Sequence, residues 1–138
     1  MTLFDPLTLP NRQSIPNRFA KASMEENMAT GDRNPSSSLI TLYQQWAKGD
    51  LGLILSGNVM IAADAMTGPG GVVLDENSDL SLFEQWAKAG KQNGGQFWMQ
   101  INHPGRQMPT DINAEGLAPS AIAMDLTGCI ENTPISSY

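Results

Sequence analysis

A four-residue sequence that occurs twice constrains the fold of this chain more than any other feature. Gln-Trp-Ala-Lys stands at residues 45–48 and again at residues 85–88, and a strand-like apolar segment follows each copy, at residues 51–56 and 96–101. The chain therefore contains one helix–strand unit twice. An earlier strand is predicted at residues 18–22, so the expected order is strand, helix, strand, helix, strand.

Both helices have a predicted start, a predicted end and one apolar face. The first begins after Pro35, with Ser36 or Ser37 as its cap, and ends at Gly49. Its apolar residues recur at three- and four-residue spacing: Leu39, Ile40, Tyr43, Trp46 and Ala47. The second helix begins at one of three polar residues: Asn77, Ser78 or Asp79. Its apolar face consists of Leu82, Phe83, Trp86 and Ala89 or Gly90, and Gly94–Gly95 closes the unit.

The order of elements predicts an α/β fold with a parallel sheet. Residues 51–55 are continuously apolar, which is typical of a parallel strand covered on both faces. Right-handed crossovers give a sheet that closes into a barrel or stays open and doubly wound. The 40-residue spacing favours the barrel, because eight such units approach or exceed the ~250 residues of a (β/α)8 enzyme. We therefore predict that residues 1–138 form the N-terminal part, about three β/α units, of a single (β/α)8 TIM barrel domain.

Composition excludes several classes of partner. Fourteen acidic residues against eight basic ones give a net charge of -6 without a basic run, so nucleic acid is not an expected partner. One cysteine, Cys129, and one histidine, His103, form neither an internal disulfide nor a four-ligand zinc site, which indicates a reducing, cytoplasmic compartment. The most apolar stretch, residues 51–63, is shorter than the ~20 residues of a membrane span, and no signal peptide is visible.

Polar residues stand where the predicted strands end, which is where barrel enzymes carry their chemistry. These segments are residues 22–26, 56–58 and 100–103. The Gln100 amide offers a donor and an acceptor together, which matches the edge of an imide or a pyrimidine. Gly57 allows a flat ring to lie against the chain. The alternative stays open that such residues only satisfy loop backbone groups.

Three other motifs have simpler interpretations. His103 lies in Asn-His-Pro-Gly, where a turn role is favoured over that of a general base. Glu25 and Glu26 are adjacent, so they are a poor carboxylate pair, although one of them could point into the site. Gly-Pro-Gly-Gly at residues 68–71 lacks the lysine of a phosphate-binding loop and predicts a turn before a short strand at residues 72–74.

An ordered set of segments resembles the N-terminal third of the Old Yellow Enzyme family. The segments are LFDPL at 3–7, PNRFAKASME at 16–25, GLILSGNV at 52–59, QINHPGRQ at 100–107 and APSA at 118–121. This family consists of FMN-dependent NAD(P)H:flavin oxidoreductases on a (β/α)8 barrel, many of which reduce the activated C=C bond of enones. The resemblance implies FMN as cofactor, NADH or NADPH as reductant and a small enone-like substrate.

The resemblance also implies which residues contact the flavin. It places the isoalloxazine on the backbone of four residues after the first strand: Ala22, Ser23, Met24 and Glu25. Gly57 would lie near the ring, and Gln100 would hydrogen-bond its pyrimidine edge. Family members often have Pro-Met-Thr or Pro-Met-Cys where this chain has Ser-Met-Glu. A carboxylate near flavin N5 and O4 would disfavour the reduced anion unless it points away or is protonated.

The family's substrate-binding pair, its proton-donating tyrosine and its phosphate-binding loops correspond to positions beyond residue 138. No catalytic residue is therefore assigned here, and we expect the 138-residue chain alone to be inactive. A second hypothesis is a truncated, non-catalytic barrel fragment that associates with another chain, or with itself, through its open edges. A third is a barrel enzyme without flavin, such as a lyase. Lys21 would be its Schiff-base candidate, but no partner residue accompanies it.

Overall fold

The computed structural model describes residues 2–120 and 122, so Cys129 lies outside the described residues. The elements in chain order are β1 (Leu7–Thr8), β2 (Ser14–Ile15), β3 (Ala20–Lys21), α1 (Ser37–Ala47), β4 (Leu53–Met60), β5 (Val72–Val73), α2 (Leu80–Gly90), β6 (Gln96–Asn102) and the 3-10 turn η1 (Gly105–Gln107). This order confirms the predicted alternation of strands and helices from β3 onward. No helix in the described part is long and apolar enough to cross a membrane.

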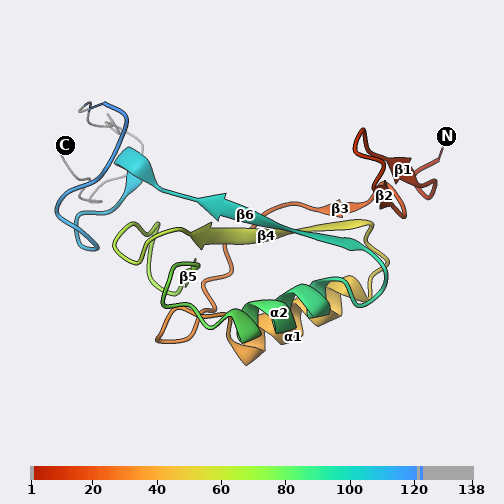
Figure 1. Cartoon of the computed structure of the whole chain (residues 1–138), viewed down its shortest axis with the longest axis horizontal. Helices are drawn as coiled ribbons and strands as arrows, with labels where there is room; N and C mark the ends of the chain where they lie inside the picture. Colours follow the sequence, from red (N-terminus) through yellow and green to blue (C-terminus); the bar gives the residue numbers. More distant parts are fainter. Residues whose placement is uncertain (1, 121, 123–138) are drawn as a thin grey trace, which may run out of the picture.

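The main sheet is parallel and has β4 at its centre (Figure 1). Strand β6 pairs along β4 from Leu53↔Gln96 to Met60↔Asn102. Strand β3 pairs with the start of β4 and β5 with its end, so these two short strands share the other edge of β4. The small β1–β2 hairpin is antiparallel and forms a separate sheet near the start of β3. The three strands β3, β4 and β6 therefore run in the same direction, and the segment that follows β3 continues along β4, where the Met24 carbonyl lies beside Gly57.

The helices begin at the predicted caps. The Ser36 hydroxyl accepts the N–H of Leu39 at 3.1 Å at the start of α1, and Asp79 accepts the N–H of Ser81 at 2.9 Å at the start of α2. Such bonds satisfy N–H groups that have no partner within the helix. Gly49 follows the C-cap of α1, and its N–H donates to the Trp46 carbonyl at 3.0 Å.

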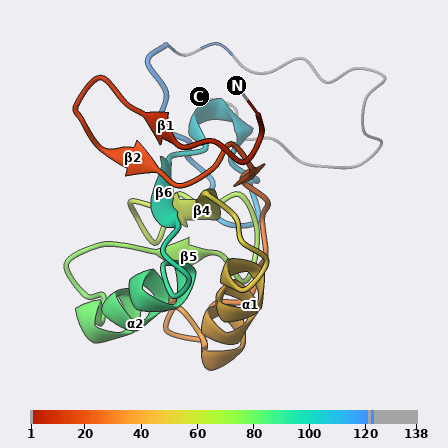
Figure 2. The same ribbon diagram turned by 90° about the vertical axis from the view of Figure 1, so that its right-hand side faces the viewer.

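Both helices pack on one face of the sheet and lie side by side there (Figure 2). The core between them and the sheet is aromatic. The Tyr43 ring meets Trp86 at 5.2 Å and Phe97 at 5.3 Å, in both cases edge to face. Its other fully or nearly fully buried members include Leu39, Ala47, Ile54, Val59, Val72, Phe83 and Ala89. This face confirms most of the apolar stripes predicted for the two helices, although Ile40, Trp46 and Leu82 are only partly buried and Leu82 is not part of this core.

The opposite face of the sheet, called the bare face below, is uncovered over the first part of β4 and over β6 in the described part of the chain, whereas nearer the carboxyl end Met60 and Val73 pack there with Met66. Side chains alternate between the faces of a strand, and Ile54 is 1% exposed, whereas its neighbours Leu53 and Leu55 are half-buried. On β6, Phe97 is buried and Trp98 is 39% exposed. The apolar residues 51–55 of the β4 segment are therefore covered on one face only within the described residues, as expected for part of a barrel, and their coverage on both faces stays a prediction. In a (β/α)8 barrel that face is filled by layers of side chains from all eight strands.

Candidate functional site

A β-bulge in β4 determines which side chains reach the bare face. The pairing passes from Leu55↔Trp98 directly to Asn58↔Gln100, so two residues of β4, Ser56 and Gly57, lie opposite a single residue of β6. Without the extra residue, Leu55 and Asn58 would point to opposite faces of the sheet. The bulge instead turns Asn58 to the face that carries Trp98 and Gln100.

The Ser56 side chain stabilises the bulge. Its hydroxyl accepts the N–H of Gln100 at 2.8 Å and donates to the Gly57 carbonyl at 2.7 Å, and Ser56 is fully buried. These bonds satisfy backbone groups that the interrupted ladder leaves without their usual partners. The strand can thus continue to Met60, four residues beyond the end predicted at residue 56.

The Gln100 amide is held in one orientation with a free acceptor. Its Nε2 donates to Asn58 Oδ1 at 2.5 Å, and Gln100 is half-buried. Its Oε1 has no hydrogen-bond partner among the described residues. The residue predicted to meet a pyrimidine edge therefore offers an acceptor at the carboxyl end of β6, next to the exposed Trp98.

Glu25 extends this polar group across the ends of three strands. The Thr67 hydroxyl donates to Glu25 Oε1, and Asn58 Nδ2 lies 3.5 Å from the same oxygen. Thr67, Glu25, Asn58 and Gln100 thus form one polar row, which brings together two of the residues predicted for the site, Glu25 and Gln100. Sequence analysis did not assign Asn58 or Thr67 to the site. The position of Asn58 directly after Gly57 was a signal, but its side-chain direction depends on the bulge.

The segment after β3 runs along the same edge. Ala22 and Met24 are exposed, Ser23 is half-buried, and the amide nitrogens of Ser23 and Met24 donate no hydrogen bond within the described part of the chain. Unpaired N–H groups are available to a ligand that carries carbonyl oxygens or ring nitrogens. The four residues predicted beneath the ring therefore lie beside the polar row, with Glu25 a member of both.

Gly57 is in close contact with the chain rather than beside open space. A Cβ at this position would collide with the Met24 carbonyl oxygen and with Glu26 Oε2. The glycine thus permits the segment after β3 to approach the bulge. Its predicted place near a flat ring stays a prediction.

Beneath this segment, on the face covered by the helices, lies a buried charge cluster of Lys21, Glu26 and Tyr43. Lys21 Nζ lies 3.3 Å from Glu26 Oε1 and donates to the Leu55 carbonyl at 3.1 Å, and both charged side chains are 9% exposed. The Tyr43 hydroxyl donates to Glu26 Oε1 at 2.7 Å and accepts the N–H of Gly57 at 3.2 Å. Burial, and then the bond to Glu26, raise the pKa of Tyr43 well above its usual range.

The two glutamates consequently point apart. Glu25 faces the polar row and Glu26 faces the buried charge cluster, which agrees with the prediction that they do not act as a pair.

His103 takes the predicted turn role, because its Nδ1 accepts the N–H of Gly105 at 3.0 Å and Gly105 has a positive φ of 57°. Within residues 2–120, no three His, Cys, Asp or Glu side chains gather in a way that could hold a metal ion.

Comparison with known proteins identifies the family. Residues 2–135 match the family model described as the NADH:flavin oxidoreductase / NADH oxidase family. This chain belongs to that family. It is 31% identical to the NADH-dependent flavin oxidoreductase iliE of Hypocrea jecorina, over 88% of this chain and 32% of the relative. It is 36% identical to the NADH-dependent flavin oxidoreductase nadA of Aspergillus parasiticus, over 83% of this chain and 28% of the relative. The chain thus spans about a third of the length of these curated relatives.

Solved structures give the same result for the fold. The Old Yellow Enzyme homologue from Zymomonas mobilis superposes with a TM-score of 0.77 at 22% identity, over 99% of this chain and 39% of that one. Morphinone reductase superposes with a TM-score of 0.77 at 25% identity, over 88% of this chain and 32% of that one. The Old Yellow Enzyme resemblance and the prediction of a partial (β/α)8 barrel are confirmed. The flavin-free lyase hypothesis is wrong, since the family is one of flavin oxidoreductases and Lys21 is committed to Glu26.

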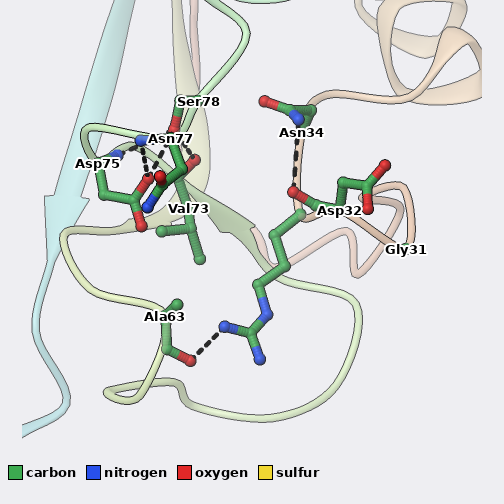
Figure 3. A pocket seen from close by; sticks show the side chains of 9 residues that line it. Gly31, Asp32, Asn34, Ala63, Val73, Asp75, Asn77 and Ser78 are labelled. Carbon is green, nitrogen blue, oxygen red and sulfur yellow. Dashed lines mark hydrogen bonds between the residues drawn. The ribbon is translucent and has the colours of Figure 1, made fainter.

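In this family member a polar hollow lies away from the predicted site residues. A cavity of about 580 Å³ is bordered by the loops before α1 and α2 (Figure 3). Its side chains close these loops: Arg33 donates to the Ala63 carbonyl, Asn34 accepts the N–H of Asp79 at 2.9 Å, and Ser78 donates to the Val73 carbonyl at 3.0 Å. These contacts explain the cavity's polar lining as loop closure.

Proposed function

We propose that residues 1–138 form the N-terminal segment of a single FMN-binding barrel domain and hold the pyrimidine side of the flavin ring. The protein's activity would be NAD(P)H-dependent reduction of activated C=C bonds in small enone-like substrates, with FMN carrying the hydride when bound. Family membership supports the reaction class. The single observation that carries the placement is the free Gln100 Oε1, held at the end of β6 by the bond from Nε2 to Asn58.

The residues at this edge fit the chemistry of a flavin ring. A pyrimidine edge with an N–H between two carbonyls needs an acceptor for the N–H and donors for the oxygens. Gln100 Oε1 supplies the acceptor, and the unpaired amides of Ser23 and Met24 supply donors. Trp98 adds an exposed aromatic surface on the face that carries Gln100. Ala22 completes the backbone segment next to Ser23 and Met24, and Glu25 and Gly57 lie beside it. The Gln100 acceptor and the two backbone donors have no other hydrogen bond to break when the ring binds.

Glu25 would set the charge beside the ring. Its carboxylate is directed at Thr67 and Asn58, so an anionic group stands within the polar row. Negative charge there opposes further negative charge on a bound ligand. We therefore propose that Glu25 lowers the tendency of the bound flavin to accept electrons, compared with relatives that have a neutral residue at this position.

We also propose a location and a mode of self-association. A cytoplasmic location agrees with a single cysteine in the whole sequence. The net charge of -6 disfavours nucleic acid. Self-association is proposed through the outer edges of β3 and β6, which have no strand partner within the described residues and expose unpaired backbone groups. If the 138-residue chain acts alone, we expect it to bind without turnover, and steady NADPH oxidation coupled to cyclohexenone reduction would contradict that expectation.

An FMN titration of matched variants of the complete protein tests the placement. Gln100→Leu keeps the side-chain volume roughly but removes the acceptor, which costs about 1 to 3 kcal/mol, or a roughly ten- to hundredfold weaker FMN dissociation constant. Gln96→Leu is the control, because Gln96 begins the same strand and its amide contacts the Ser14 carbonyl at the other end of the sheet. Thermal unfolding without flavin separates lost affinity from lost stability. Equal FMN affinity in the wild type and Gln100→Leu would overturn the placement.

A further inference from the structure

We infer that the buried charge cluster of Lys21, Glu26 and Tyr43 is a positioning device that holds residues 22–25 in the shape that receives the flavin ring. The inference rests on the proposed function, because it assigns a role toward the ring to residues that do not touch it. Its structural part, the ordering of residues 22–25, is separately measurable without flavin.

The first argument is the place of the ion pair in the chain. Lys21 ends β3, and Glu26 follows the predicted ring-binding segment, so the two charges flank residues 22–25 on either side. Their contact at 3.3 Å closes this segment into a short loop. The segment makes no backbone hydrogen bond through the amides of Ser23 and Met24. Besides the Glu25 contacts with Thr67 and Asn58, its conformation is therefore maintained by the contacts at its two ends.

The second argument is the direction of each hydrogen bond. The Tyr43 hydroxyl uses its proton for Glu26 at 2.7 Å and its lone pair for the Gly57 N–H at 3.2 Å. It thereby connects α1 to both the loop and the bulge. Lys21 likewise bonds Glu26 and the Leu55 carbonyl, and its ammonium lies 4.3 Å from the centre of the Trp46 ring. The Tyr43 hydroxyl, the Lys21 ammonium and Glu26 Oε1 thus tie backbone segments from β3, β4 and α1 to one another.

The third argument concerns cost. Removing two charges from water is unfavourable, and well-packed apolar residues of similar size often stabilise a core equally well or better. An ion pair at 9% exposure on each side is therefore a poor choice for stability alone. A directional pair does what apolar packing cannot, since it selects one geometry. Here the geometry selected places the Met24 carbonyl and Glu26 Oε2 against Gly57.

The consequence reaches both halves of the proposed ring site. The cluster holds the amides of Ser23 and Met24 at the end of β3, and through Gly57 it also holds the bulge that turns Asn58 toward Gln100. Loosening the cluster should therefore disturb the ring-binding segment and the Gln100 acceptor together, although none of the three side chains reaches the bare face.

The test uses two variants, one control and two readouts. Tyr43→Phe removes one hydroxyl and keeps the ring, and Lys21→Met removes the charge with little change in length. Phe83→Leu is the control, because it weakens the α2 side of the core, where Phe83 packs with Trp86 away from the cluster. Backbone ¹⁵N order parameters of residues 22–25, measured without flavin, report the segment itself. FMN dissociation constants of the same proteins report whether the order of this segment matters for flavin binding.

We expect order parameters near the rigid value of about 0.85 in the wild type and Phe83→Leu, and a fall toward about 0.6 in Lys21→Met. Tyr43→Phe should fall less. FMN affinity should weaken at least tenfold in Lys21→Met and stay within twofold in Phe83→Leu. Unchanged order parameters in both cluster variants would overturn the inference, as would increased mobility with unchanged FMN affinity. If the wild type binds no FMN, the proposed function fails, and the order parameters still decide whether the cluster orders this segment.

Discussion

The two faces of the central sheet are built from the same strands and differ in what covers them. On one face Ile54 and Phe97 pack under the helices with Tyr43 and Trp86, all at 9% exposure or less. On the other, Trp98 is 39% exposed beside the polar pair of Asn58 and Gln100. The covered face therefore provides the stability of this chain, and the bare face provides groups that are still free to bind. The bulge at Ser56–Gly57 connects the two, because it turns Asn58 to the bare face beside Gln100.

The largest predicted difference between the faces comes from a matched pair of tryptophans. Trp86→Ala removes a side chain that is 1% exposed in the aromatic core, which should cost about 3 to 5 kcal/mol and can unfold the chain. Trp98→Ala on the bare face should change the free energy of unfolding by less than about 1 kcal/mol. Urea unfolding of both variants provides the comparison. Equal losses would mean that the bare face is covered in solution, for example by a second copy of the chain.

A matched pair of glycines tests the contact between the bulge and the segment after β3. Gly57→Ala places a Cβ against the Met24 carbonyl and Glu26, which should cost about 1 to 3 kcal/mol. Gly68→Ala is the control, because a Cβ there meets no atom within 4 Å. Thermal unfolding should show a lower melting temperature for the first variant only. A Gly57→Ala protein as stable as the wild type would show that the segment does not lie against the bulge.

Tyr43 gives the covered face a dependence on pH. Burial and Glu26 raise its pKa in the folded state above the ordinary value of 10.0, so its contribution to stability is present below that pH and is lost as the pH rises above it. At neutral pH, Tyr43→Phe should be less stable than the wild type by about 1 kcal/mol. Urea unfolding between about pH 8 and about pH 11 should show this difference shrinking at the alkaline end. A difference independent of pH would contradict the burial of the hydroxyl.

The smallest effect is expected on the outer surface of α2. Lys88 and Glu84 form an ion pair at 2.7 Å, four residues apart along the helix, but their side chains are 73% and 66% exposed. Exposed pairs of this kind contribute little and are screened by salt. Lys88→Gln should leave the unfolding curve unchanged within experimental error, at both low and high salt. A clear, salt-dependent loss would show that this surface is buried in an assembly.

Much of the covered face could be predicted from the sequence, because it depends on local patterns. The repeated Gln-Trp-Ala-Lys sequence fixed two helix–strand units, and the caps at Ser36 and Asp79 were among the residues expected. Leu39, Tyr43, Phe83 and Trp86 pack as their spacing implies. Such features need only the helical period and the polarity of each residue.

The site was less accessible to sequence analysis, because it depends on contacts between distant residues. No local pattern announces that Ser56 and Gly57 form a bulge, so the face that Asn58 occupies could not be deduced. Lys21 within an apolar strand was a visible signal of a buried charge, but its partner Glu26 depends on the turn of the chain, and Tyr43 looked like an ordinary member of an apolar stripe. Gln100 was predicted from its amide at a strand end and then by resemblance, Glu25 by resemblance, and the structure adds the row that connects them.

The most direct test of the central claim is a map of where FMN binds on the ¹⁵N-labelled chain. Binding at the bare face predicts that changes in amide chemical shift concentrate at residues 22–25, at Asn58 and at Trp98–Gln100. The side-chain amide of Gln100 should shift as well. The loops around the Arg33 cavity and the β1–β2 hairpin should stay unchanged. Shifts confined to those loops, or none at saturating FMN, would contradict the account.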